Sequence, residues 1–110
     1  MKTYEEINKA AQNFLSMMEI RRNARFQDSE FEIVATLVKG RKYHRIVTDT
    51  RIKATGKMFD QRSCGGFIDG EGNIYKSAGW KAPAKNIRGN IFDDGGLSAL
   101  DCLGYINYLR

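Results

Sequence analysis

Hydrophobic residues near the N-terminus recur at the spacing of an amphipathic helix over residues 3–25. Three or four positions separate its apolar members, which places them on one face of the helix. These members are Tyr4, Ile7, Ala11, Phe14 and Met18. Thr3 and Glu6 have the spacing of a capping box, which predicts where the helix begins.

The apolar face of this helix continues into two cations, because the same spacing leads to Arg21 and Arg25. Two interpretations stay open. The arginines neutralise the C-terminal end of the helix and extend into water, or they enter a pocket or a subunit interface where they meet an anion.

Beyond residue 30 the pattern changes to a period of two, which is typical of β-strands. Residues 31–38 alternate between apolar and polar positions, and residues 43–49 follow after a tight connection, so the two segments predict a hairpin. Residues 49–61 are polar and contain Gly56, which predicts a loop between strands.

A third strand is predicted over residues 62–69, and a turn over residues 70–73 leads to a fourth. Gly65 and Gly66 interrupt the third strand. A glycine pair there indicates a β-bulge or, less commonly, a place where another group approaches the backbone closely. Residues 104–110 predict a terminal strand.

A short second helix is predicted over residues 83–88, because Pro83 suits a first helical position and Gly89 follows the last. The 110 residues suffice for one domain, residues 1–110. The predicted fold class is α+β, with a long N-terminal helix packed on an antiparallel sheet of four or five strands.

The net charge of +5 and a pI near 9.4 favour an anionic partner, although a charge of this size also keeps a small domain in solution. No signal-peptide pattern and no membrane-spanning run is evident in the sequence, so we expect a cytoplasmic protein without a membrane partner. Cys64 and Cys102 lack metal-ligand spacing, which predicts two reduced, partly buried thiols and no cofactor or metal.

Catalytic motifs are weak. The one histidine, His44, lies in the middle of a predicted strand, where a packed or surface role is commoner than catalysis. Asp93 and Asp94 precede two glycines and predict a turn, and there is no phosphate-binding or nucleophile motif. We therefore expect a protein that is not an enzyme.

The segment of residues 76–90 carries cations and a tryptophan but no acidic residue. The cations, which surround Trp80, are Lys76, Lys81, Lys85 and Arg88. Cations neutralise phosphate and an indole stacks on a base, while Asn90 offers both a donor and an acceptor. The alternative places Trp80 in the core and leaves the lysines as a solvated rim.

The stretch GGFIDGEGNIYKSAGWKAPAKNIRGNIFDD, residues 65–94, resembles small phage proteins, and we identify the first-described Thoeris anti-defence family as the group it is similar to. The resemblance implies a non-enzymatic sponge that sequesters cyclic ADP-ribose-type immune signals in the cytoplasm of an infected bacterium. It also implies that some members capture cyclic oligonucleotides at separate sites of a homo-oligomer, a hexamer.

The resemblance further implies which residues bind the ligand. The family's helix arginines would correspond to Arg21 and Arg25, its aromatic residue to Trp80, its asparagine to Asn90 and its C-terminal arginine to Arg110. Together with the cations of the basic segment, the candidate ligand-binding residues are Arg21, Arg25, Trp80, Lys81, Lys85, Arg88, Asn90 and Arg110.

Two other functions remain open from the sequence. The same basic segment suits a phage nucleic-acid-binding protein, and the net charge suits an inhibitor that docks on an acidic host defence protein.

Overall fold

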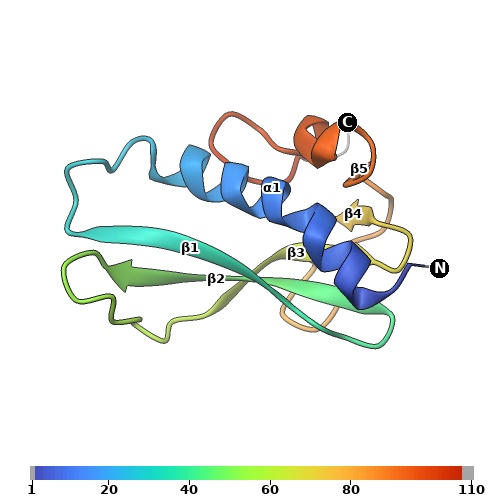
Figure 1. Cartoon of the computed structure of the whole chain (residues 1–110), viewed down its shortest axis with the longest axis horizontal. Coiled ribbons are helices and arrows are strands. Elements are labelled where there is room, and N and C mark those ends of the chain that lie inside the picture. The colour runs from blue at the N-terminus through green and yellow to red at the C-terminus, as the bar shows by residue number, and fades with distance from the viewer. Residues whose placement is uncertain (1, 108–110) are drawn as a thin grey trace.

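One long helix lies across one face of a five-stranded antiparallel sheet in the computed structural model, which describes residues 2–107 (Figure 1). The helix is α1 (Tyr4–Asn23), and a short 3₁₀ helix, η1 (Asp94–Ala99), packs beside it. The strands, which pair in sequence order, are β1 (Phe31–Val38), β2 (Tyr43–Ile52), β3 (Ser63–Asp69), β4 (Asn73–Tyr75) and β5 (Gly89–Asn90). The predicted α+β class is confirmed.

The start of α1 is the capping box expected from the sequence. The backbone N–H of Glu6 donates to the Thr3 hydroxyl at 3.2 Å, and the backbone N–H of Thr3 donates to the Glu6 carboxylate at 3.2 Å. Two backbone donors at the helix start are thereby satisfied.

The core lies between α1 and the sheet. The helix contributes Ile7, Ala11, Phe14, Leu15 and Met18, all buried. Opposite them lie apolar residues of the sheet and the C-terminal segment, among them Ala35, Ile46, Ile68, Ile74, Ile91, Leu100 and Ile106. Burial of these side chains supplies most of the stability, because each removes apolar surface from water.

The C-terminal end of α1 is fastened to β1, which is an edge strand. The Asn23 amide accepts from the backbone N–H of Ile33 at 2.7 Å and donates to the Ile33 carbonyl at 2.9 Å. The backbone N–H of Ala35 donates to the Glu19 carboxylate at 2.7 Å. Helix side chains therefore occupy edge positions that would otherwise be open for pairing with another strand.

The glycine pair in β3 forms the predicted β-bulge. Ile46 pairs with Gly66 and Val47 pairs with Cys64, so Gly65 is the extra residue. Gly66 has φ 147°, a backbone conformation that residues other than glycine rarely adopt. The bulge brings Ser63 opposite Thr48, and their hydroxyls lie 2.8 Å apart.

The prediction of a helix over residues 83–88 is wrong in its placement. This segment belongs to a hairpin-like excursion between β4 and β5, in which the N–H of Ala84 donates to the Lys76 carbonyl at 2.7 Å. Asn86 has φ 75°, which interrupts a right-handed helix. The short second helix is η1 instead, and it forms where the sequence predicted only a turn followed by an ambiguous segment.

Of the terminal strand predicted over residues 104–110, the described residues show only a single bridge between Ile106 and Leu100, and residues 108–110 lie outside the described residues. β2 runs to Ile52, three residues into the segment expected to be a loop. None of the helices in residues 2–107 is long and apolar enough to cross a bilayer.

Replacing Gly66 with alanine tests the bulge. A Cβ there would lie 2.3 Å from the Ile106 side chain and 2.8 Å from the Tyr75 carbonyl oxygen, at an unfavourable φ. We expect Gly66→Ala to lower the free energy of unfolding by roughly 2–4 kcal/mol. Urea titration followed by circular dichroism measures this. Gly79→Ala is the matched control, because nothing lies within 4 Å of its Cβ position, and it should change stability by less than about 0.5 kcal/mol.

Candidate functional site

A groove lies at the C-terminal end of α1, where the helix meets β2, β3 and the segment after η1. It consists of two adjoining cavities of about 260 and 430 Å³, a combined size that suits a small organic ligand. Arg22, Thr48, Ser63 and Tyr105 line both cavities. We call this feature the helix-end groove.

Arg22 is the central cation of the helix-end groove. Its Nε donates to the Gly104 carbonyl at 2.9 Å, and its guanidinium lies 4.1 Å from the centroid of the Tyr105 ring. Within residues 2–107 its two terminal nitrogens donate no hydrogen bond to protein. Burial lowers the pKa of Arg22 below its usual value, while nearby Tyr105 and Asp101 act in the opposite direction. A partly desolvated cation of this kind gains from an incoming anion.

The two ends of the groove carry further positive charge. Arg25 lines the smaller cavity beside Phe26, and Lys76 lines the larger one beside Ser77. The Lys76 ammonium donates to the Ile106 carbonyl at 2.9 Å, which orients it toward the C-terminal segment. Cations therefore flank the groove as well as occupying its middle.

Asp49 is the one carboxylate among the described residues that line the groove. It is buried, and its Oδ1 accepts from the backbone N–H of Thr50 at 2.7 Å and of Gln61 at 3.1 Å. These hydrogen bonds attach the loop before β3 to β2.

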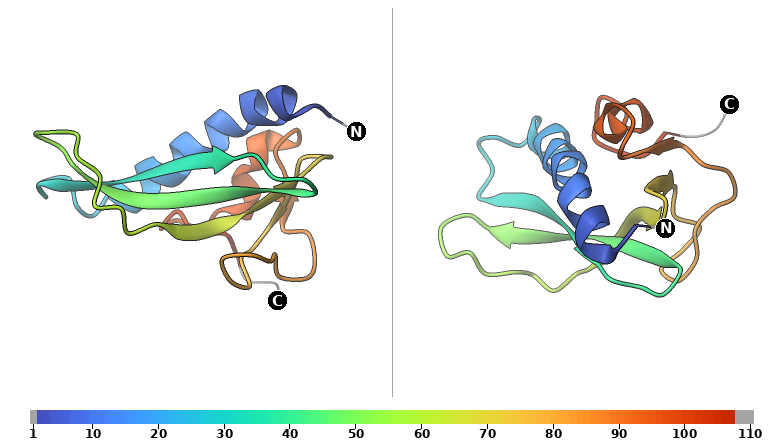
Figure 2. Two further views of the ribbon diagram at one scale, coloured as in Figure 1. Left: turned by 90° about the horizontal axis from the view of Figure 1, so that it is seen from below. Right: turned by 45° about the vertical axis from the view of Figure 1, so that its right-hand side comes forward.

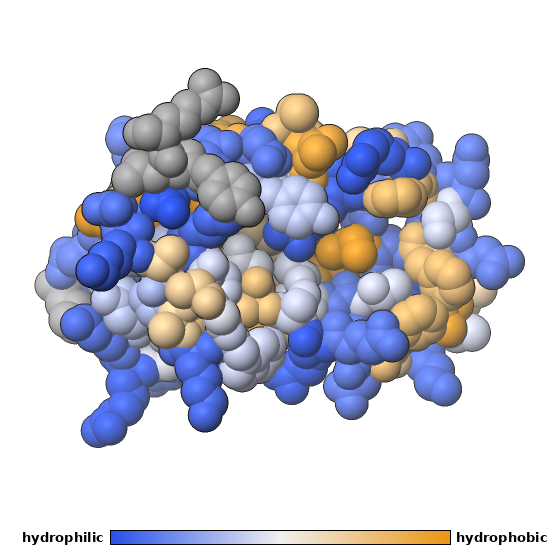
Figure 3. All heavy atoms as spheres, turned by 180° about the vertical axis from the view of Figure 1, so that it is seen from behind, coloured by the Kyte–Doolittle hydropathy of each residue, from blue (hydrophilic) through white to orange (hydrophobic). Residues whose placement is uncertain are grey.

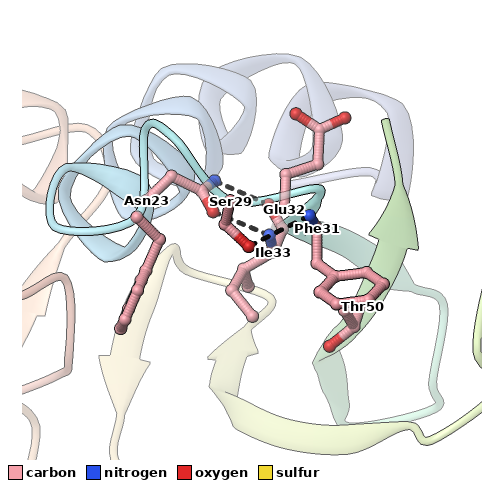
Figure 4. A pocket seen from close by; sticks show the side chains of 7 residues that line it. Asn23, Ser29, Phe31, Glu32, Ile33 and Thr50 are labelled. Atoms are coloured by element: carbon pink, nitrogen blue, oxygen red, sulfur yellow. Dashed lines mark hydrogen bonds between the residues drawn. The ribbon is translucent and has the colours of Figure 1, made fainter. Parts of the chain in front are cut away.

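A smaller apolar cavity of about 190 Å³ adjoins the groove (Figure 4). Asn23 and Ser29 lie at its rim, hydrogen bonded to the first residues of β1, while Phe31 and Ile33 supply apolar walls. Phe26 lines both this cavity and the groove. The groove thus has a charged centre and an apolar margin.

The predicted site residues do not gather at one place. Arg25 lines the helix-end groove, but Arg21 turns away and donates to the carbonyls of Leu100 and Asp101 at 3.3 and 3.2 Å. Trp80 is 39% exposed, so the interpretation that placed it in the core is wrong. It does not line the groove, although the preceding residue Gly79 does, and its ring lies against Arg45 and Arg62.

Asn90 has no polar atom left for a ligand. Its Nδ2 donates to the Glu71 carbonyl and the Asn73 side chain, both at 3.0 Å, and its Oδ1 accepts from the backbone N–H of Phe92 at 2.8 Å. The side chain therefore ties β5 to the turn before β4.

Arg88 is largely occupied, because its Nε donates to the Asn107 carbonyl at 3.0 Å and its Nη1 donates to carbonyls of the preceding loop, and it does not line the helix-end groove. Lys81 and Lys85 are exposed on the loop between β4 and β5. Arg110 lies outside the described residues.

Sequence reasoning missed Arg22 and Tyr105. A signal for Arg22 was present, because it follows the buried Met18 by four positions, whereas the extrapolated spacing used a step of three and reached Arg21. No local pattern marks Tyr105, which joins the groove only through the packing of the C-terminal segment against α1.

His44 is a packed residue, as expected. It is 7% exposed, and its Nδ1 accepts from the backbone N–H of Gly40 at 3.1 Å. Its ring packs edge-on against the Tyr4 ring, with 4.9 Å between the ring centroids. Nowhere in the described part of the chain do three His, Cys, Asp or Glu side chains gather as a metal site would require. Both cysteines are unpaired; Cys64 is half-buried, whereas Cys102 is exposed rather than partly buried.

Comparison with protein families gives one match, which covers residues 2–108. The chain belongs to DUF7717, a family of unknown function. Membership therefore adds no ligand or activity to the geometry. No curated protein matches the sequence, and no solved structure matches the fold.

The buried histidine makes stability depend on pH. Burial and the charge of Lys39 lower the pKa of His44 below the ordinary 6.5, and Asp69 opposes this shift. A lowered folded-state pKa means that the neutral ring stabilises the fold above about pH 6.5 and that this stabilisation is lost as pH falls further. We expect the free energy of unfolding, from urea titrations at pH 7.5 and 5, to fall on acidification. His44→Gln keeps an acceptor for Gly40 but does not titrate, so a pH dependence equal to wild type in this variant contradicts the assignment.

Proposed function

We propose that the protein captures a phosphate-bearing nucleotide without transforming it, and that the helix-end groove holds the ligand. Arg22 carries the proposal. It is a half-buried guanidinium that has no carboxylate salt bridge within residues 2–107, and it lines both cavities. A phosphate oxygen is the partner that would satisfy its terminal nitrogens in charge-assisted hydrogen bonds.

The surroundings of Arg22 suit the other parts of a nucleotide. Tyr105 has one face against the Arg22 guanidinium and is 46% exposed, so its ring is available to a base. The hydroxyls of Thr48 and Ser63 can donate or accept toward ribose or phosphate oxygens. Arg25 and Lys76 supply positive charge for a second phosphate.

Cyclic ADP-ribose isomers are the first candidate ligands, because the resemblance of residues 65–94 implies such signals, and they carry two phosphates and a purine. Cyclic oligonucleotides are the second candidates for the same reason. The proposed role is sequestration of an immune signal in the cytoplasm of an infected bacterium. Holding a ligand unchanged needs no nucleophile, and the groove's carboxylate, Asp49, already accepts two backbone hydrogen bonds.

Sequestration requires tight binding, about −12 kcal/mol for a nanomolar Kd. An open groove provides a weaker binding free energy than this, because water competes for every polar contact. Tight binding therefore requires that another surface close the mouth of the groove. A homo-oligomer, expected to be a hexamer, would provide the closure. Hydrophobic side chains gather toward the right-hand side of Figure 3. Phe26 and Phe31, which line the apolar cavity beside the groove, are exposed, and the exposed Phe59 ring lies 5.1 Å from the Phe31 ring.

Isothermal titration with cyclic ADP-ribose isomers tests the proposal. We expect saturable heat with wild type, and a Kd at least tenfold weaker in Arg22→Ala because a charged hydrogen-bond donor is lost. Arg25→Ala should weaken binding less. Lys9→Ala, which removes a cation from an exposed position of α1, should leave the Kd unchanged.

Arg22 also contacts Gly104, so circular dichroism must show that the Arg22 variant is folded; Arg25→Ala, at an exposed position, serves if it is not. Mass spectrometry of the ligand released by heat should return it intact. No heat with any isomer at tens of micromolar protein, or an altered ligand, overturns the proposal.

A further inference from the structure

We propose that the sheet face opposite α1 binds single-stranded nucleic acid along a row in which cationic and aromatic side chains are interleaved. The row, in spatial order, consists of Lys42, Tyr43, Phe67, Arg45, Trp80 and Arg62. None of these six residues lines the helix-end groove, and the proposal does not depend on the function proposed for that groove.

Strand alternation places the row on one face. Arg45 pairs with Phe67, and Phe67 pairs with Tyr75, so these three side chains project from neighbouring strands to the same side. The adjacent residues Ile46 and Ile68 project to the other side and are buried in the core under α1. The loop of residues 76–88, light orange in the left view of Figure 2, lies on the side of the sheet away from α1.

Neighbouring side chains of the row lie close together. The Lys42 ammonium lies 5.5 Å from the centroid of the Tyr43 ring, and the Tyr43 and Phe67 rings are 6.3 Å apart. The Arg45 guanidinium lies 5.9 Å from the Phe67 ring and 4.6 Å from the Trp80 ring. Arg62 lies 5.8 Å from the same indole. Cations and rings therefore follow one another across the sheet.

Arg45 is held in place, and its charge is not cancelled. Its Nε donates to the Trp80 carbonyl at 2.8 Å, which fixes the guanidinium against the indole. In the part of the chain that is described, its terminal nitrogens have no hydrogen-bond acceptor. Two guanidinium groups share one indole, so an anion placed beside them relieves their mutual repulsion.

Asp69 is the carboxylate at the end of the row, and it is already occupied. Its oxygens accept from the backbone N–H groups of Glu71 and Asn73, from the Asn73 amide and from the Tyr75 hydroxyl, at 2.9 to 3.1 Å. These hydrogen bonds hold the β3–β4 turn. Phe67 is itself only 2% exposed and supports the rings beside it. The row therefore presents positive charge to a partner, and its accessible aromatic surface is the exposed Trp80 and the half-buried Tyr43.

The combination selects single strands over other polyanions. Phosphates of a single strand bind the cations, and its unpaired bases stack on exposed rings, above all on Trp80. A duplex keeps its base faces covered by stacking and pairing. An acidic polypeptide without aromatic residues, such as poly-glutamate, supplies charge but no rings to cover the 39% exposed indole.

Trp80 is the single tryptophan of the chain, so its fluorescence reports contact at the row directly. We expect the oligonucleotides dT12 and rU12, titrated separately at about 50 mM salt, to quench Trp80 fluorescence with saturation, and the affinity to fall linearly with salt on logarithmic axes. Quenching by either strand supports the proposal, and the stronger one identifies the preferred type of strand. A 12-base-pair duplex and poly-glutamate should quench weakly or not at all.

Variants locate the contact by anisotropy of fluorescein-labelled strands. Trp80→Ala should weaken binding at least fivefold, and Trp80→Phe should recover most of the loss because a ring is restored. Arg62→Ala should reduce the salt slope by about one, as expected when one phosphate contact is removed. The control Lys9→Ala removes a charge from the opposite side of the molecule and should leave the slope unchanged.

Three results overturn the proposal. They are binding that leaves Trp80 fluorescence unchanged, equal affinity of wild type and Trp80→Ala, and competition by poly-glutamate as strong as by dT12, which would point to an acidic protein surface. Arg22→Ala belongs to the other site and should not alter strand binding, so failure here is distinguishable from failure of nucleotide capture.

Discussion

The attachment of the last turn of α1 on two sides is the constraint on which the rest of the structure depends. On one side, Asn23 and Glu19 hydrogen bond the backbone of β1. On the other, Arg21 and Arg22 donate to carbonyls of the C-terminal segment. The helix end is therefore fixed between an edge strand and a segment about 80 residues away in sequence. The helix-end groove is the space that these attachments leave open.

Local signals sufficed for most of the fold. The capping box fixed the start of α1, alternation located β1 and β2, and the glycine pair marked the bulge in β3. The helix expected over residues 83–88 failed because its proline and glycine are equally compatible with a hairpin. Pairing of residues 76–78 with 82–84 decided the outcome, and that pairing depends on β4 lying beside β3.

The site was harder to predict than the fold, because polar side chains serve structure and binding with the same chemistry. Asn90 was chosen for its donor and acceptor, yet both are used within the chain. Arg21 and Arg22 are adjacent in sequence but donate to different carbonyl oxygens. Continuing the helical spacing from Met18 by three positions leads to Arg21, whereas continuing it by four leads to Arg22. One of the two interpretations of Trp80 makes it accessible, which the structure confirms, but its contact with Arg45 depends on the folding of the loop back under the sheet.

The side-chain hydrogen bonds at the β1 edge also limit how copies of this protein can meet. Asn23 and Glu19 already occupy the N–H groups of Ile33 and Ala35, and the opposite edge, β5, is only two residues long. Among residues 2–107, neither border offers a long run of free backbone groups. The fold therefore favours assembly by packing of side-chain surfaces over a sheet that continues from one subunit into the next.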